Sequence, residues 1–326
     1  SIKKKKGSVM ATENYPIRFV YSPEYNFALD GLVHHPILVH LSNRYKYIAD
    51  QLKDAGVMHD NNTYIPNENA NEIIKSITTP EYRKFLATSK GACSCFLRLN
   101  EQIDEHMVES VLLEPMKRMT MGTLKAAQLS YQHGGMSINI GGGFHHARRD
   151  SCGGFCIYND FLASAQWLWN VNQKIRILYI DLDAHLGDGV LAECARDRRF
   201  FHYDLYNTFG SERIDKIKGQ VFLYGLPIHS KDSAYLGILH ENLEEMITVS
   251  KPDFVFYNAG SDPIVGDELG ILNLSSAGLL RRDEFVFNLL KKYEIPSIMT
   301  LSGGYTSLSI GAVSRSIANL KKLSTK

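Results

Sequence analysis

The sequence predicts an α/β protein: one domain built on an open, mostly parallel β-sheet flanked by helices. Short runs rich in β-branched and aromatic residues alternate with longer stretches of helical periodicity, most regularly after residue 135. Most of these runs are apolar on both faces, as strands of a buried parallel sheet are. No repeat, low-complexity tract or linker divides the 326 residues. We therefore expect a single domain over 15–326, preceded by a flexible basic tail over 1–14.

The periodicity places each element along the chain. A strand is expected over 15–21, and apolar residues at spacings of three and four predict a helix over 38–52 that ends near Gly56. Another helix covers 121–133 and stops at two glycines. The later strands are expected over 136–140, 175–181, 199–205, 220–226, 253–260 and 295–301, with helices over 236–250 and 279–293.

Charge and composition exclude several classes of protein. The net charge of +1 creates no global field that would attract nucleic acid or an anionic membrane. No apolar run approaches the roughly 18–20 residues of a membrane span. The five cysteines form no CxxC pair, and an odd count is typical of a reducing compartment. We therefore expect five buried or unreactive thiols, no disulfide framework, and an intracellular, soluble protein.

Small and polar residues gather where four of the expected strands end. These segments read GGGFHH (141–146), DLDAHLGDG (181–189), AGSDP (259–263) and LSGGY (301–305). The carboxyl ends of parallel strands share one edge of the sheet, where open α/β folds build their ligand sites. The sequence therefore predicts one site assembled from segments more than a hundred residues apart.

The second of these segments suggests a metal site. Asp183 and His185 are two residues apart at a strand end, so their side chains leave on the same face. Asp262 is a third ligand candidate from another strand end. An Asp/His/Asp set with open positions suits catalytic zinc, although iron(II) or another divalent ion is compatible with it. An isolated Asp-x-His is more often a solvated or capping pair, but the other polar strand ends favour a metal.

The adjacent histidines supply the base that such a metal needs. Two carboxylate ligands leave less positive charge on the ion, so a water that it binds is less acidic. One of His145 and His146 is expected to move the proton while the other holds the water. Asp181 and Asp188 are available to fix the ring tautomers, and the preceding glycines let both rings approach.

Tyr305 is the candidate donor to the developing oxyanion, because its phenol follows two glycines at a strand end. Competing motifs fit less well. A dinucleotide-binding motif has a glycine at its sixth position and then opens a helix. Here the sixth position is His146, and no helix is expected after it. No G-x-S-x-G segment is present, and neither Cys152 nor Cys156 has the local signature of a nucleophile.

Five motifs of this chain resemble those of the zinc-dependent histone deacetylase family in their order and spacing: GGGFHHA, GGFC, DLDAHLGDG, NAGSDP and SGGY. The resemblance extends from about Tyr15 to near the C-terminus and implies the arginase/deacetylase-like α/β fold. Phe144 before the histidine pair, GGFCIYND, DLYN and the early YNFALDGLVHHP look closest to class IV members. Leu186 and Asp188 depart from class IV, which often has Gln and Asn there.

The resemblance also implies roles for individual residues. Asp183, His185 and Asp262 match the zinc ligands, His146 with Asp188 matches the general base and acid, and His145 with Asp181 matches the water-positioning histidine. An aspartate at 188 is expected to make His146 more basic. The remaining implied residues are Tyr305 as the carbonyl-polarising group, Gly154, Phe155, Gly303 and Gly304 along the substrate tunnel, and Asp181, Asp183 and Asp204 near a structural potassium ion.

These residues predict a zinc-dependent amidohydrolase that removes acetyl, and in the class IV interpretation long fatty acyl, groups from protein lysines. One catalytic metal is expected, because SDPIVGD lacks the extra aspartate of binuclear arginase relatives. An acyl-lysine protein or peptide is the expected partner, without nucleic acid. Two alternatives stay open: an amidohydrolase acting on acetylated polyamines, and an inactive acyl-lysine-binding scaffold.

Overall fold

A computed structural model describes residues 15–29, 35–66, 69–96 and 103–326, so the expected basic tail lies outside the described residues. The described chain forms one nine-stranded sheet in the order β2-β1-β3-β9-β8-β4-β5-β7-β6. Every pairing is parallel except that of β6 with β7. The strands are β1 Ile17–Val20, β2 Thr63–Tyr64, β3 Met136–Asn139, β4 Ile177–Asp181, β5 Phe200–Asn207, β6 Ile214–Lys218, β7 Val221–Leu226, β8 Phe254–Asn258 and β9 Ser297–Thr300.

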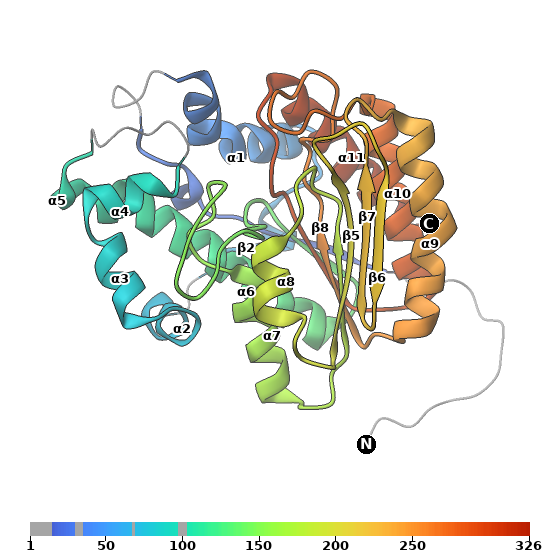
Figure 1. Ribbon diagram of the computed structural model, residues 1–326, viewed down its shortest axis with the longest axis horizontal. Helices are drawn as coiled ribbons and strands as arrows, with labels where there is room; N and C mark the ends of the chain where they lie inside the picture. The colour runs from blue at the N-terminus through green and yellow to red at the C-terminus, as the bar shows by residue number, and fades with distance from the viewer. Residues whose placement is uncertain (1–14, 30–34, 67–68, 97–102) are drawn as a thin grey trace.

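Helices cover both faces of the sheet (Figure 1). Helices α6, α7 and α8 lie on one side and α9, α10 and α11 on the other, while α2 to α5 form a group beyond α6. Their bounds are α1 Pro36–Asp54, α2 Ala70–Ile77, α3 Pro80–Leu86, α4 Ser89–Ser94, α5 Glu105–Val108, α6 Glu114–His133, α7 Asp160–Val171, α8 Asp188–Cys194, α9 Asp232–Ser250, α10 Ser276–Lys292 and α11 Ser307–Leu323. The predicted α/β class and mostly parallel sheet are confirmed.

The central strands are buried along their whole length, which explains why their sequences are apolar without alternation. In β4 and β8 every residue is buried. The expected strands over 136–140, 175–181, 199–205, 220–226, 253–260 and 295–301 all form, and so do the expected helices. The sequence reasoning missed β6, whose residues are all exposed, and the two-residue edge strand β2. Neither carries the apolar run that identifies a buried strand.

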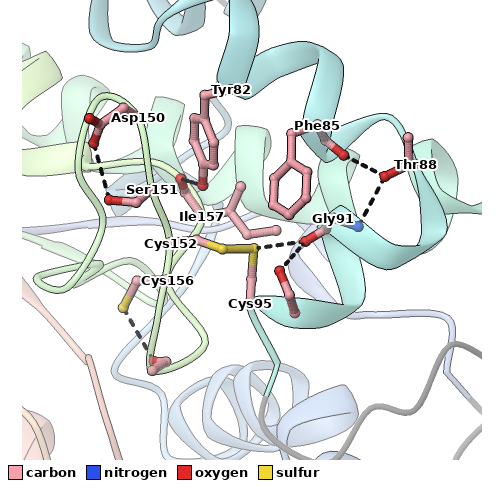
Figure 2. Close-up of a disulfide and its surroundings, with 12 residues drawn as sticks. Tyr82, Phe85, Thr88, Gly91, Cys95, Asp150, Ser151, Cys152, Cys156 and Ile157 are labelled. Atoms are coloured by element: carbon pink, nitrogen blue, oxygen red, sulfur yellow. Dashed lines mark hydrogen bonds between the residues drawn. A yellow bond between two sulfur atoms is a disulfide. The ribbon is translucent and has the colours of Figure 1, made fainter.

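The expectation of five unpaired thiols is wrong. Cys95, directly after α4, and Cys152, in the loop before α7, form a disulfide, with their Cα atoms 5.3 Å apart (Figure 2). The pair is separated by 57 residues, so no local spacing in the sequence announces it. Cys93, Cys156 and Cys194 are buried. The cysteine count therefore no longer supports the inference of a reducing compartment.

Among the described residues, no helix is both long enough and apolar enough to cross a membrane.

Candidate active site

Four neighbouring strands carry the polar segments to one edge of the sheet. In the order β3-β9-β8-β4, each strand ends where one of the segments identified from the sequence begins. The strands are parallel, so their carboxyl ends lie side by side and the segments meet there. The convergence that the sequence predicts is present in the structure.

Three of the predicted ligands meet at this edge. One ligand atom from each of Asp183, His185 and Asp262 can be chosen so that all lie within 4.8 Å of one another. Both carboxylates are buried. His185 Nδ1 lies 2.9 Å from Asp262 Oδ2 and 3.1 Å from Asp183 Oδ1. This is the only such group found among the described residues.

The arrangement of His185 and the two carboxylates fits a bound cation. Its Nε2 lies 3.0 Å from the carbonyl oxygen of Leu269, which can only accept, so Nε2 carries the hydrogen. In the neutral ring, Nδ1 then directs a lone pair at two carboxylates, and Asp262 Oδ2 has no hydrogen-bond partner despite its burial. Burial would lower the pKa of His185, but the two carboxylates raise it to about 11. A divalent ion satisfies all three groups, so these residues fit the expected metal.

Backbone amides orient both carboxylates. Gly303 N donates to Asp183 Oδ2 at 2.9 Å, and Ala184 N donates to Asp262 Oδ1 at 3.0 Å. A Cβ atom on Gly303 would lie 2.7 Å from Asp262 Oδ2 and 2.8 Å from Asp183 Oδ2. The close approach of this backbone to the ligands therefore requires glycine.

The two histidines differ in their surroundings. His145 Nδ1 lies 2.8 Å from Asp181 Oδ2, and His146 Nδ1 lies 2.7 Å from Asp188 Oδ1, with the ring centroids 4.1 Å apart. Burial disfavours a charge on His145, but Asp181 and Asp183 raise its pKa to about 10. His145 is therefore the charged member of the pair.

His146 is the neutral member of the pair, although Asp188 acts in the expected direction and raises its pKa. Burial and then the neighbouring charge of His145 lower the pKa of His146, and together they outweigh Asp188. Asp188 is also shared, because Arg148 Nη2 donates to its other oxygen at 2.8 Å. A neutral imidazole with one nitrogen held by a carboxylate is the form that a general base requires.

The glycine run and α7 position the histidine loop. Gly143 has a φ of 90°, and a Cβ atom there would lie 2.6 Å from Asn258 Oδ1. Asp160, at the start of α7, accepts from Gly143 N at 2.8 Å and Phe144 N at 2.9 Å. Beyond the histidines, Asn159 Nδ2 donates to Ala147 O at 2.8 Å. The first turn of α7 thus holds the loop on both sides of the histidine pair.

Aromatic rings frame the approach to these groups. The Phe155 ring lies 5.4 Å from the Tyr305 ring, and a Cβ atom on Gly154 would lie 2.3 Å from His146 Cδ2. Burial and then the charge of Asp262 raise the pKa of Tyr305 well above its usual value, so its phenol stays protonated. Asp267 holds this segment by accepting from Tyr305 N at 2.8 Å.

A narrow cavity of about 30 Å³ lies behind this approach and is lined by apolar side chains. Gly154, Phe155, Gly303 and Tyr305 contribute to its lining, together with Phe27, Leu41, Tyr45, Phe96 and Met116. Gly304 does not line this cavity; a Cβ atom on it would meet Ser261 Oγ at 2.1 Å. Its expected tunnel role thus has no support in this cavity.

Several residues at the site were missed by the sequence reasoning. The exposed ring of Phe209 lies 5.6 Å from the His185 ring, and Phe209, like Phe155, has a positive φ angle. The signal for Phe209 was its place two residues after β5, a fifth strand end. Arg44 is fully buried in α1 and donates to the carbonyls of Leu301 and Gly303 at 3.2 and 2.9 Å. No local pattern points to Arg44.

The fold is an open α/β sheet, and one of its edges brings together a candidate Asp–His–Asp metal site, two histidines paired with carboxylates, and buried Tyr305. The family model described as "Histone deacetylase domain" matches residues 39–320. The chain is 34% identical to Histone deacetylase 2 of Arabidopsis thaliana over 227 residues, covering 66% of this chain and 56% of that protein. It is 30% identical to Histone deacetylase 1 of Homo sapiens over 287 residues, covering 83% of this chain and 58% of that protein.

A similar fold is seen in the crystal structure of the HDA15 HD domain, with a TM-score of 0.75, 19% identity, and coverage of 95% of this chain and 90% of that one. This chain therefore belongs to the histone deacetylase family. It spans a little over half the length of the curated relatives named above.

Proposed function

We propose that this chain is a zinc-dependent amidohydrolase that removes acyl groups from the lysine side chains of proteins. The observation that carries the proposal is the three-ligand group beside neutral His146 and protonated Tyr305. Membership of the histone deacetylase family supports the same activity. Suitable residues occupy the positions of the base, the phenol and all three metal ligands. This disfavours the alternative of an inactive scaffold.

Each residue has a separate task in the hydrolysis. His146 accepts a proton from the attacking water while Asp188 holds its Nδ1–H, and His145, held by Asp181, keeps the water in place. Tyr305 donates a hydrogen bond to the carbonyl oxygen as negative charge develops there. His146 then returns the proton to the lysine nitrogen as the C–N bond breaks, which leaves a carboxylate and a free amine. Bound between Asp183, His185 and Asp262, zinc would supply a Lewis acid for the carbonyl and lower the pKa of the water.

The acyl length is tested with two peptides of one sequence that carry acetyl-lysine or myristoyl-lysine. The class IV resemblance favours long acyl chains, whereas the cavity of about 30 Å³ holds only a small group unless its wall moves. A preference for myristoyl in kcat/KM would support the class IV interpretation and imply that the apolar wall opens. A preference for acetyl would assign the chain to ordinary deacetylation, and turnover of neither peptide would contradict the proposal.

The polyamine alternative has one observation in its favour. Glu268 is exposed in a groove of about 390 Å³ that also contains Tyr305, and a carboxylate there could attract a cationic substrate. Higher kcat/KM for an acetylated polyamine than for the acetyl-lysine peptide would favour this alternative. That preference should then disappear in Glu268→Gln.

We also propose a structural potassium ion beside Asp181 and Asp204. Both side chains are fully buried on neighbouring strands, and Asp204 Oδ1 has no hydrogen-bond partner. Burial and then the charge of Asp181 raise the pKa of Asp204 to about 6. Potassium chloride should therefore raise the unfolding temperature more than the chloride of a large organic cation does. An equal effect of the two salts would contradict the site.

A further inference from the structure

Arg282, in α10, is completely buried, although it carries a charge that the proposed hydrolysis does not use. A buried guanidinium is costly unless its donors are matched, so its partners indicate why it is there. We propose that Arg282 is a positioning residue for the metal group: its guanidinium fixes the two strand ends from which Asp183 and Asp262 project. The inference rests on the metal site of the proposed function.

The guanidinium reaches both ligand-bearing segments at once. Arg282 Nη1 donates to the carbonyl oxygen of Leu182 at 3.0 Å and to that of Gly260 at 2.6 Å. Leu182 directly precedes the ligand Asp183, and Gly260 lies two residues before the ligand Asp262. One nitrogen atom therefore links the backbones that carry the two carboxylate ligands.

These backbones need a link at this point because the sheet no longer supplies one. The pairing of β4 with β8 ends at Asp181 and Asn258. Beyond it, Leu182 N still donates to Asn258 O at 3.0 Å, and a Cβ atom on Gly260 would lie 2.7 Å from Asp183 Cα, so the two segments stay close together. Arg282 therefore joins the two segments just beyond the last strand pairing, and the distance between the two ligand carboxylates depends on these segments.

The guanidinium is itself held from behind. Its Nε donates to Asp283 Oδ1 at 2.8 Å, and Asp283 also accepts from Tyr257 in β8 and from Ser316 in α11. Burial works against the charge, but Asp283 and its neighbours raise the pKa of Arg282, so the guanidinium stays protonated. Tyr235, in α9, donates to Leu182 O at 3.0 Å as well. The network anchors the metal-bearing backbone to three helices.

Only arginine offers this geometry, since its planar guanidinium can donate to the two backbone carbonyls through Nη1 and to Asp283 through Nε at the same time. Lysine keeps the charge but loses the fork, and methionine loses both. The informative measurement is therefore Co²⁺ affinity and the visible absorption of the bound ion, both recorded on metal-stripped protein. We expect Arg282→Met to bind Co²⁺ about 10- to 100-fold more weakly with an altered spectrum. The Co²⁺ affinity of Arg282→Lys should lie between that of wild type and that of Arg282→Met.

Loss of stability alone must be separated from loss of positioning. Leu168→Ala removes a buried side chain from α7 and provides a destabilised control whose Co²⁺ affinity and spectrum should match wild type. Where Arg282→Met does not fold, Asp283→Asn, which keeps the guanidinium but loosens it, should still shift the spectrum.

Two results would overturn the inference, and they are distinguishable. Arg282 variants that lose stability as the control does, but bind Co²⁺ with wild-type affinity and spectrum, would show a purely structural role. Wild-type protein that binds no Co²⁺ would remove the metal site itself, and with it the proposed function.

Discussion

The Tyr305 hydroxyl is the donor that the proposed hydrolysis needs at the carbonyl oxygen, and it is not itself one of the three proposed metal ligands. Tyr305→Phe should therefore lower kcat by about 100-fold or more while the protein keeps its metal. The measurement is kcat together with zinc content by elemental analysis. Wild-type turnover in this variant would remove the assigned role, and loss of zinc would show that the change disturbed the site.

His40 provides a test of pH dependence away from the metal group. Burial and then the charge of Arg44 lower the pKa of His40 to about 4, and its Nε2 lies 3.1 Å from Gly304 O. In the unfolded chain this histidine takes a proton near its ordinary pKa of 6.5. Between these values the unfolded state binds more protons, so stability falls as the pH drops from 6.5 toward 4.

His40→Gln cannot titrate and provides the control for that window. Between about pH 7 and pH 5, wild type should lose roughly 1 kcal/mol more unfolding free energy than the variant, after allowance for partial exposure. Urea unfolding at the two pH values measures this difference. Equal losses in both proteins would mean that His40 is protonated in the folded state as readily as in the unfolded chain.

At the scale of residues, the sequence predicted the polar groups of the site but not their supports. The two histidines, the proposed metal ligands and Tyr305 lie in short motifs at strand ends, where the sequence itself shows the residue types and their spacing. Phe209, Arg44 and Arg282 act through contacts with segments far away in the chain. The net pKa of His146 also depends on burial and on the charge of His145; the motif contains His145 but shows neither its charge nor the burial.

At the scale of elements, the disulfide joins α4 to the loop that carries Phe155. Phe155 N donates to Cys95 O at 3.1 Å, and the Phe96 and Phe155 rings lie 6.0 Å apart. Phe155 has a φ of 67°, a conformation that persists in a bulky residue only when its surroundings impose it. The bond between Cys95 and Cys152 is therefore part of the restraint on the wall of the cavity that Phe155 lines.

Reduction by a dithiol, which exchanges with the disulfide to leave two thiols, should loosen this wall. We expect the free energy of unfolding to fall by up to about 4 kcal/mol for a loop of this length, and kcat/KM to fall about tenfold. Cys152→Ser should show both losses already and should not respond to the dithiol. An equal response of the variant and wild type would place the redox effect elsewhere.

A helix or strand could be predicted where its buried residues form a continuous apolar run or a regular apolar repeat in the sequence. The strands from β3 onward are wholly or mostly buried, apart from exposed β6. The short helices α2 to α5 lack a long apolar repeat and were not predicted. Their packing places Cys95 beside Cys152, so the missed disulfide follows directly from the missed helices.

At the scale of the whole molecule, the sheet order converts separate motifs into one site. Strands β3, β9, β8 and β4 are neighbours in space, although β3 and β9 are more than 150 residues apart in the chain. Parallel strands with polar carboxyl ends predicted this convergence, but strand order was not predicted, because it depends on the crossover paths of the helices. The proposed activity therefore depends on one centre that works only when all four strand ends are in place.

The most direct test of that centre is removal and return of its metal. Protein stripped by a chelator should not hydrolyse an acyl-lysine peptide, and about one equivalent of zinc should restore turnover. Asp262→Asn, prepared in the same way, should regain little activity at that zinc concentration. Full turnover by stripped wild-type protein, with elemental analysis confirming that no metal remains, would contradict the account.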